Sequence, residues 1–262
     1  MKATVIKNTK LSDKFGYMEL QCPEIAREKN AGRFFMLSPH NNNTYITDPL
    51  LKRPFAICDI VSEDIFTCLY MIAGRGTYIL SEALPGNDFL VTGPIGNFFR
   101  LEKNAKIALM AGGIGLAPMI NAAKKLKELG SHVTLYYGGR SKEDILMPEF
   151  LYEICDEVII TTDDGSLGIK GLVTEPLRER IKDYKKIYAC GPNRMLQASA
   201  SLCSENSVPI EVSLDEQMGC GVGACLGCII LINENGKQVK KRCCVEGPIF
   251  DGTKVNWDAL IR

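Results

Sequence analysis

The first hundred residues alternate short apolar runs with turn-forming residues. The runs are rich in β-branched and aromatic side chains, and Gly, Pro, Asn and Asp separate them. Runs of this length and spacing predict antiparallel strands that form a small barrel or sandwich. The expected strands cover residues 3–8, 33–39, 53–61, 65–74 and 88–96, and one short helix covers 79–84.

From residue 105 onward, continuous apolar runs alternate with segments of helical periodicity. Strands that alternate with helices predict right-handed βαβ units and a parallel sheet with helices on both faces. Ser141-Lys-Glu-Asp144 has the form of a capping box, so we expect a helix to begin there. The other expected helices cover 116–126, 174–182 and 195–204, and the expected strands cover 106–111, 132–139, 157–164, 186–192 and 209–214.

The last segment differs from both preceding parts. Residues 228–243 read as a β-hairpin with Asn235-Gly236 at its turn, and five cysteines lie within 25 residues. The predicted fold is therefore multidomain: an antiparallel β-barrel over 1–101, an α/β parallel-sheet nucleotide-binding domain over 102–210, and a small C-terminal cysteine-rich domain over 211–262.

Composition narrows the function classes. Lys plus Arg and Asp plus Glu number 31 each, so the 262-residue chain has no net charge and no electrostatic footprint for nucleic acid or anionic membranes. The longest nearly apolar run, 107–120, is interrupted by three Gly and a Pro and is too short to span a bilayer. No apolar signal segment opens the sequence, so we expect a cytoplasmic protein. In that compartment the 11 cysteines are not expected to form a disulfide framework.

The cysteine spacing predicts an iron–sulfur cluster. Cys220, Cys225 and Cys228 form C-x4-C-x2-C, and a fourth Cys follows at 243 or 244, which is the plant-type spacing for four thiolates around a 2Fe–2S cluster. Structural zinc is the competing interpretation, but zinc sites favour two separated Cys pairs rather than three cysteines and an adjacent pair. Only one of the adjacent pair is expected to be a ligand, because neighbouring side chains of a strand point to opposite faces. Cys244 is the favoured candidate.

Three further segments carry candidate phosphate-binding chemistry. Gly112, Gly113 and Gly115 separate a predicted strand from a helix, where a pyrophosphate can approach the backbone closely. Arg53 interrupts an apolar strand and needs an anionic partner, either a carboxylate or a phosphate. Gly74-Arg75-Gly76-Thr77 suits a phosphate or a plain turn. No acidic residue ends the second predicted parallel strand, and Arg140 follows it, which leaves NAD and NADP both open.

Together these motifs resemble the ferredoxin–NADP reductase superfamily, whose barrel holds FAD and whose α/β domain holds NAD(P). The strings SLDEQMGCGVGACLGC and KRCCVEGPIF narrow the resemblance to the electron-transfer subunits of NAD-dependent, heterotetrameric dihydroorotate dehydrogenase. The resemblance covers essentially the whole chain. It implies that FAD contacts Arg53, Pro54, Phe55, Ala56, Tyr70, Met71, Ile72, Gly76 and Thr77, that the nicotinamide nucleotide contacts Gly112, Gly113, Gly115, Cys190, Gly191 and Pro192, and that Cys220, Cys225, Cys228 and Cys244 hold the cluster. Ala56 departs from the family, which usually has a hydroxyl side chain there.

The same resemblance implies a function in pyrimidine biosynthesis. Electrons from a catalytic FMN subunit that oxidises dihydroorotate would pass through the 2Fe–2S cluster and FAD to NAD⁺, with two copies of each subunit in a heterotetramer. With His40 and His132 as its only histidines the chain lacks the makings of a Ser–His–Asp hydrolase, and we assign it no catalytic residue. The alternatives are the reductase subunit of another complex, linked to sulfide, sulfite or ferredoxin, and a non-enzymatic redox sensor.

Overall fold

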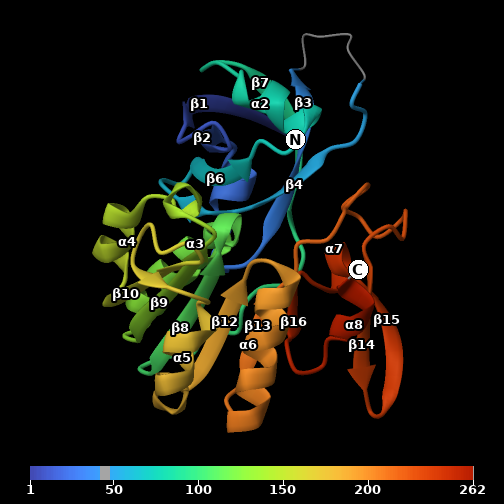
Figure 1. The fold of residues 1–262 in the computed structure, drawn as a ribbon. Helices are drawn as coiled ribbons and strands as arrows, with labels where there is room; N and C mark the ends of the chain where they lie inside the picture. Colours follow the sequence, from blue (N-terminus) through green and yellow to red (C-terminus); the bar gives the residue numbers. More distant parts are fainter. Residues whose placement is uncertain (42–47, 262) are drawn as a thin grey trace.

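The computed structural model describes residues 1–41 and 48–261. Two seven-stranded sheets and a two-stranded hairpin form the molecule, and Figure 1 shows the first sheet above the second with the C-terminal segment along one side of both. The predicted combination of an antiparallel barrel, an α/β domain and a C-terminal segment is thereby confirmed. None of the helices in the described residues is long and apolar enough to cross a membrane.

The first sheet is antiparallel and has the strand order β4-β3-β7-β1-β2-β6-β5. The sheet is curled. Its two edge strands, β4 and β5, follow each other in the chain, and only Ile57 and Cys58 separate them. Ile57 N–H donates to the Arg33 carbonyl, and Cys58 N–H donates to the Thr67 carbonyl, which ties the two edges together. Its elements are β1 (Lys2–Lys10), β2 (Phe15–Gln21), α1 (Pro23–Ala26), β3 (Phe34–Asn41), β4 (Arg53–Ala56), β5 (Asp59–Ile60), β6 (Ile65–Met71), α2 (Arg75–Ser81) and β7 (Asp88–Ile95).

The second sheet has the order β11-β10-β9-β8-β12-β13-β16 and is parallel except for β16. The central strands consist of continuous runs of apolar residues that are buried on both faces of the sheet, as expected for a sheet covered by helices. Its strands are β8 (Lys106–Gly112), β9 (His132–Gly139), β10 (Glu157–Thr162), β11 (Ile169–Lys170), β12 (Lys186–Cys190), β13 (Ile210–Ser213) and β16 (Ile249–Asp251). Its helical segments are η1 (Gly113–Gly115), α3 (Leu116–Glu128), η2 (Lys142–Asp144), α4 (Pro148–Ile154), α5 (Thr174–Arg180), η3 (Ile181–Asp183) and α6 (Asn193–Asn206).

The C-terminal segment is not a detached body. The hairpin β14 (Ile229–Glu234) and β15 (Lys237–Arg242) turns at Asn235-Gly236, as the sequence predicts, and is followed by α7 (Cys243–Glu246) and α8 (Trp257–Leu260). Between these helices, β16 pairs with β13 and extends the parallel sheet. The domain boundary expected at residue 210 therefore falls on the first residue of β13, and the segment after it contributes a strand to the preceding domain.

Two local predictions differ from the structure. The short helix expected over 79–84 lies earlier in the chain, as α2 over Arg75–Ser81, and the helix expected to begin at Ser141 does not form there. Ser141 does not cap a helix: its hydroxyl donates to Glu143 at 2.5 Å, and only the single 3₁₀ turn η2 follows. The helix in this region, α4, begins at Pro148. Tyr137 Oη donates to the Asp144 carbonyl at 3.0 Å and accepts from Leu146 N–H at 3.1 Å, and these bonds hold the chain between η2 and α4 in a non-helical path.

Candidate functional site

The first cluster cysteines lie on a glycine-rich loop after β13. Cys220 Sγ accepts hydrogen bonds from Val222 N–H and Cys225 N–H, both at 3.4 Å. These N–H groups, led by that of Cys225, lower the pKa of the Cys220 thiol to about 6, so the thiolate predominates at neutral pH. Gly221 and Gly223 both have positive φ values, which lets the loop turn its amides toward the sulfur. Cys225 is exposed. Gly219 and Gly227 lie beside its sulfur, since a Cβ added to them would be 3.5 and 3.7 Å from Cys225 Sγ, respectively.

The two adjacent cysteines at the start of α7 have different environments. Cys244 N–H donates to Cys228 Sγ at 3.4 Å, and burial together with the neighbouring Cys228 raises the pKa of the Cys244 thiol to about 11. Cys243 Sγ instead donates to the Leu214 carbonyl at 3.4 Å within the hydrophobic core. Burial raises the pKa of the Cys243 thiol well above its usual value. Both cysteines therefore contact Cys228 through their backbone N–H groups, but only the Cys244 N–H is directed at the Cys228 sulfur.

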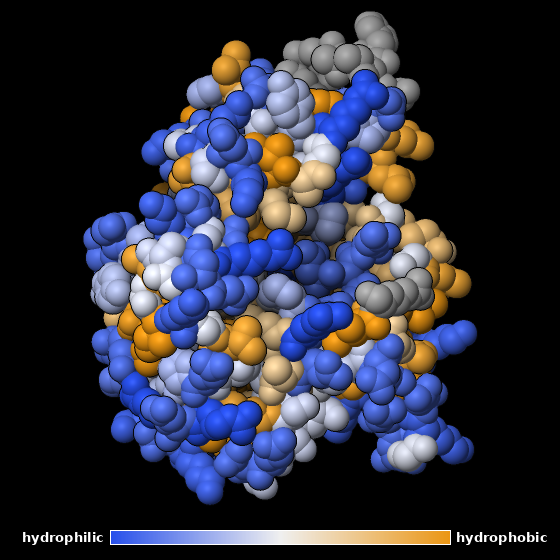
Figure 2. All heavy atoms as spheres, viewed as in Figure 1, coloured by the Kyte–Doolittle hydropathy of each residue, from blue (hydrophilic) through white to orange (hydrophobic). Residues whose placement is uncertain are grey.

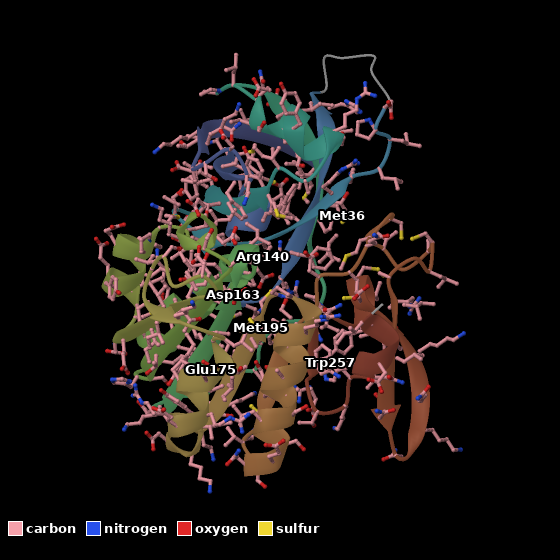
Figure 3. The ribbon with its side chains drawn as sticks, in the orientation of Figure 1. Met36, Arg140, Asp163, Glu175, Met195 and Trp257 are labelled. Carbon is pink, nitrogen blue, oxygen red and sulfur yellow. The ribbon has the colours of Figure 1, made fainter. Side chains whose placement is uncertain are left out.

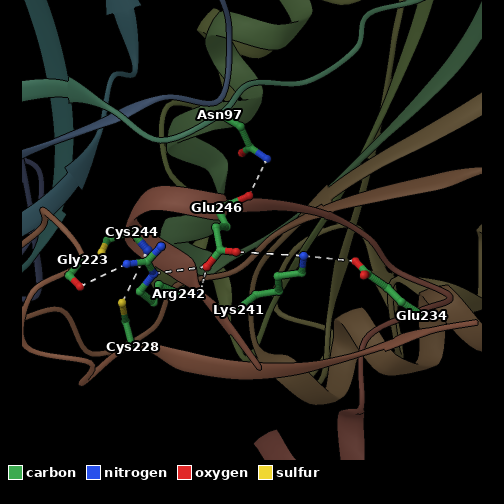
Figure 4. Close-up of polar contacts among 8 residues, drawn as sticks. All are labelled: Asn97, Gly223, Cys228, Glu234, Lys241, Arg242, Cys244 and Glu246. Carbon is green, nitrogen blue, oxygen red and sulfur yellow. Dashed lines mark hydrogen bonds and ion pairs between the residues drawn. The ribbon is translucent and has the colours of Figure 1, made fainter. Parts of the chain in front are cut away.

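A polar network that the sequence did not reveal surrounds these cysteines (Figure 4). Glu246 accepts from Arg242 N–H at 2.8 Å and from Arg242 Nε at 3.2 Å, and Arg242 Nη1 donates to the Gly223 carbonyl at 3.4 Å. The backbone carbonyl of Glu246 accepts from Asn97 Nδ2 at 3.0 Å, which connects the network to the chain just after β7. The network therefore fixes α7 and the cysteine loop to each other and to the barrel. An exposed Arg and a Glu four residues apart were the only sequence signal for it.

The cysteine loop also packs directly on the barrel. A Cβ added to Gly221 would lie 2.5 Å from Met36 Cγ, so only glycine allows this approach to β3. Met36 pairs in register with Pro54, and its neighbour Leu37 pairs with Arg53. Figure 3 places Met36 between the barrel and the C-terminal segment. The strand β3 therefore lies between the loop of the predicted cluster cysteines, which contacts Met36, and the adjacent strand β4, which bears Arg53.

The barrel residues predicted to contact FAD divide into exposed and buried ones. Arg53, Pro54, Phe55 and Ala56 form β4, and the Arg53 guanidinium lies over Gly76 in α2, where an added Cβ would be 2.3 Å from Arg53 Nε. Arg53 donates to the Leu51 carbonyl, and among the described residues no carboxylate lies in ion-pair range of it. A half-buried guanidinium without an acidic partner suits an anionic ligand better than a structural ion pair.

Three of these side chains are engaged within the protein. Tyr70 is 2% exposed in the barrel core, and its hydroxyl donates to Asn8 at 2.8 Å, so only Met71 and Ile72 of the 70–72 segment present side chains toward solvent. Phe55 is buried in the same core. Thr77 Oγ1 accepts from Ala73 N–H at 2.9 Å and Gly74 N–H at 3.2 Å, so it shapes the loop before α2. The resemblance implies that these three residues lie at the FAD site, and it does not specify contacts of their side chains.

The nucleotide-domain glycines and the 190–192 segment meet at one edge of the parallel sheet. β8 and β12 are adjacent, and at their carboxyl ends a Cβ added to Gly115 would lie 2.3 Å from the Cys190 carbonyl oxygen. A Cβ added to Gly112 would lie 2.6 Å from Pro192 Cδ, and Gly191 has a φ of +157°. Ligands of open parallel sheets bind at this edge.

Two further residues shape that edge. Tyr137, which the sequence did not single out, has its hydroxyl oxygen 3.1 Å from the Gly113 carbonyl oxygen, so its one proton is shared between this carbonyl and that of Asp144. Met195 is the second, since its Sδ would lie 2.8 Å from a Cβ added to Gly112. Burial, with the carboxylate of Asp215 as a second cause, raises the pKa of the Cys190 thiol to about 12, so this thiol stays protonated.

Across residues 1–41 and 48–261, no three His, Cys, Asp or Glu side chains converge as a single metal ion would require.

Comparisons with known proteins agree with this geometry. Residues 215–256 match the family described as the iron–sulfur cluster binding domain of dihydroorotate dehydrogenase B, and residues 109–201 match an oxidoreductase NAD-binding domain. The chain is 42% identical over 248 residues to the electron transfer subunit of dihydroorotate dehydrogenase B (NAD⁺) from Desulforamulus reducens, with 92% of each chain covered. The corresponding subunit from Caldanaerobacter subterraneus is 35% identical, with 95% of this chain and 96% of that chain covered.

Solved structures give the same fold. The structure of an NADH-dependent reduced ferredoxin-NADP oxidoreductase superposes with a TM-score of 0.86 at 30% identity and covers 99% of this chain and 91% of that chain. The ferredoxin reductase of carbazole 1,9a-dioxygenase has a TM-score of 0.67 at 21% identity, with 81% of this chain and 68% of that chain covered. The second likeness concerns the fold alone.

Proposed function

Since the chain belongs to the family of electron transfer subunits of dihydroorotate dehydrogenase B, we propose that it carries electrons from a dihydroorotate-oxidising subunit to NAD⁺. The cofactors are a 2Fe–2S cluster, FAD and NAD, and the catalytic partner carries FMN. The observation that carries this proposal is the contact of the cysteine loop with β3, directly beside the strand that bears Arg53. That contact brings a one-electron carrier close to a flavin site.

Cys220, Cys225, Cys228 and Cys244 are the proposed cluster ligands. The donor set fits, because four thiolates are what a 2Fe–2S cluster needs and backbone N–H groups already point at two of the four sulfurs. Such hydrogen bonds raise a cluster's reduction potential. The cluster supplies one-electron transfer when bound.

Arg53 is the proposed anchor for the FAD pyrophosphate. Its guanidinium has no carboxylate partner among the described residues, and Gly76 leaves room beneath it. Backbone groups of residues 70–72, rather than the Tyr70 ring, are proposed to line the flavin, together with the side chains of Met71 and Ile72. Flavin exchanges a hydride with nicotinamide and single electrons with a cluster, which lets it couple the two.

Gly112, Gly113, Gly115 and Cys190-Gly191-Pro192 are proposed to bind the nicotinamide nucleotide. The two loops contact each other closely, since a Cβ added to Gly115 would lie 2.3 Å from the Cys190 carbonyl oxygen. The protonated Cys190 thiol serves as packing and hydrogen-bonding surface there, not as a nucleophile. NAD is proposed as the nucleotide because the relatives are described as NAD⁺-dependent subunits, whereas Arg140, just after β9, is of the residue type that accommodates the 2′-phosphate of NADP.

The partner is proposed to cover the exposed aliphatic side chains around Cys225. Val222 and Leu226 on the cysteine loop are 61% and 57% exposed, and Leu50 and Leu51 before β4 are 78% and 55% exposed. Figure 2 shows hydrophobic residues gathered on this side of the molecule. Apolar side chains beside the most exposed cluster cysteine suit a stable electron-transfer interface. We expect Leu226→Asp to abolish co-purification with the FMN subunit, whereas Val61→Asp, at an equally exposed position after β5, leaves it intact.

The test is spectroscopic and then enzymatic. Anaerobically purified protein should show flavin and iron–sulfur absorption, and NADH should produce the EPR signal of a reduced 2Fe–2S cluster. The reconstituted complex should then reduce NAD⁺ with dihydroorotate. A colourless zinc protein would overturn the cofactor assignment, and a coloured complex that dihydroorotate fails to reduce would overturn the substrate.

A second candidate follows from the similarity to the NADH-dependent reduced ferredoxin-NADP oxidoreductase structure. In that case the same cofactors would serve a ferredoxin-linked complex. Reduction of the purified complex by ferredoxin, with no response to dihydroorotate, would favour this candidate.

A further inference from the structure

Cys243 is the one thiol of the C-terminal cluster of five that the proposed ligand set does not use. It is the first residue of α7, it is 0% exposed, and it directly precedes the proposed ligand Cys244. Its side chain lies in a core that also contains Met36 of the barrel and Leu214 at the end of β13. A plain hydrophobic residue would fill such a position, so the polar contacts of this thiol need an explanation.

Each polar group of Cys243 has its own partner. Its Sγ donates to the Leu214 carbonyl at 3.4 Å, its N–H donates to the Cys228 carbonyl at 2.9 Å, and its carbonyl accepts from Gly247 N–H at 3.1 Å. Leu214 is itself held, because its N–H donates to the Pro248 carbonyl at 2.9 Å. The residue therefore joins the Cys228 segment, the start of α7 and the end of β13 at one point.

This arrangement sets the orientation of one peptide group. The carbonyl of Cys243 and the N–H of Cys244 belong to the same planar peptide, and that N–H donates to Cys228 Sγ at 3.4 Å. The Sγ contact with Leu214, together with the bond from Gly247 N–H to the Cys243 carbonyl, holds the Cys243 end of this peptide and so directs the N–H at a proposed ligand sulfur. An N–H···S bond to a cluster ligand raises the cluster's reduction potential.

We propose that Cys243 is a positioning residue for the cluster, in which the thiol-to-Leu214 hydrogen bond holds the Cys244 N–H on Cys228 Sγ and thereby keeps the reduction potential high. The inference rests on the proposed ligand set of Cys228 and Cys244. The proposal assigns Cys243 no bond to iron, because the Cys243 sulfur is directed at the carbonyl of Leu214, directly after β13, and not at Cys228.

The experiment is an EPR-monitored redox titration of the anaerobic holoprotein, with the FAD midpoint as internal reference. Cys243→Ala should shift the cluster midpoint to a more negative potential and change the EPR g-values while the iron content stays at two per chain. Cys243→Ser, whose hydroxyl can donate to the same carbonyl, should return the midpoint toward the wild-type value. Cys203→Ala is the matched control, since Cys203 is equally buried in the same core and should leave the midpoint unchanged.

The outcomes separate the inference from the proposed function. A Cys243→Ala variant with wild-type potential and g-values would overturn the positioning role, and so would a Cys203→Ala variant with the same shift. If Cys243→Ala fails to retain iron, Cys243→Ser decides, because a shifted midpoint in that variant refutes the role of the donor. A Cys244→Ser variant that keeps an all-thiolate cluster spectrum would show Cys243 acting as a ligand and would also refute it. Wild-type protein without any 2Fe–2S signal would instead refute the proposed function.

Discussion

Replacing Gly115 by Ala tests whether the loops after β8 and β12 form the nucleotide site. Gly115 has φ −60° and ψ −6°, so alanine causes no backbone strain there. The added Cβ would lie 2.3 Å from the Cys190 carbonyl oxygen and 2.7 Å from Gly191 N. Both contacts are with backbone, which no rotamer change can relieve, so the two loops must separate by about 1 Å to reach ordinary van der Waals contact.

The expected loss is large in activity and modest in stability. A misplacement of about 1 Å at a reacting centre can cost about 100-fold in rate, or about 2.7 kcal/mol in transition-state free energy. Overpacking costs about 1–3 kcal/mol of unfolding free energy, against about 5–15 kcal/mol for a whole domain. The variant therefore stays folded at 25 °C, and the activity loss reports the displaced loops rather than unfolding.

The assay is NADH-driven reduction of ferricyanide by the FAD-loaded chain, with kcat/KM for NADH as the measured quantity. Gly252→Ala is the matched control, because its Cβ would lie 2.9 Å from Val212 Cγ1 in the same domain but away from the loops. We expect Gly252→Ala to lower the thermal midpoint while kcat/KM stays within about twofold of wild type. A Gly115→Ala variant with kcat/KM within about threefold of wild type would refute the placement of the nucleotide between these loops.

Three further predictions address the other sites. Arg53→Ala should weaken FAD binding by at least about tenfold, measured as flavin absorbance after gel filtration, and Arg27→Ala should not, since one charge-assisted pyrophosphate contact is worth about 1.5–3 kcal/mol. Cys225→Ser should remove most of the iron–sulfur absorption, and retention of two irons with unchanged spectra would contradict its place among the ligands. The Arg180 side chain contacts Glu157 at 2.6 Å and lowers the pKa of the Glu157 carboxyl. The ion pair therefore stabilises the fold at pH values above the pKa that this carboxyl has in the unfolded chain. The stabilisation is lost as the pH falls through the lower pKa of the folded state. Because both side chains are 38% exposed, Glu157→Gln should cost only about 0.5 kcal/mol of unfolding free energy in urea at pH 7, and a difference that persists unchanged at about pH 3 would count against the ion pair.

Local sequence signals predicted most of the strands because each strand's apolar run and bounding turn lie within a few residues. The strand β2 was missed. Its run Phe15–Gln21 contains Gly16 and Glu19, which weaken a strand pattern, yet Gly16 is needed there because the Tyr70 ring occupies the space of a Cβ, with Cζ 2.2 Å away. The reason for that glycine lies 54 residues further along the chain and cannot be read locally.

The residues of the candidate site also divide into those that sequence spacing identifies and those that only the packed fold identifies. Spacing alone identified three cysteines and the glycine loop, because the chemistry depends on residues that are close in sequence. Spacing could not separate Cys243 from Cys244, since two identical neighbours differ only in what surrounds them: Leu214 for one and Cys228 for the other. Likewise the resemblance places Tyr70 along the flavin, and only the packed barrel shows that the Tyr70 hydroxyl is bonded to Asn8.

The contact between Gly221 and Met36 bears on electron transfer between the proposed cluster and the proposed FAD site. Tunnelling requires a short and constant separation, and flexible loops would let that separation vary. Here the cysteine loop and β3 share one hydrophobic core, and Asn97 adds hydrogen bonds from the end of β7 to the carbonyls of Glu246 and Ile249 at 3.0 and 2.8 Å. The separation between the proposed cluster and the proposed FAD site is therefore set by core packing, which is close to incompressible. A substitution at Gly221 should alter electron transfer between the two cofactors even if each of them still binds.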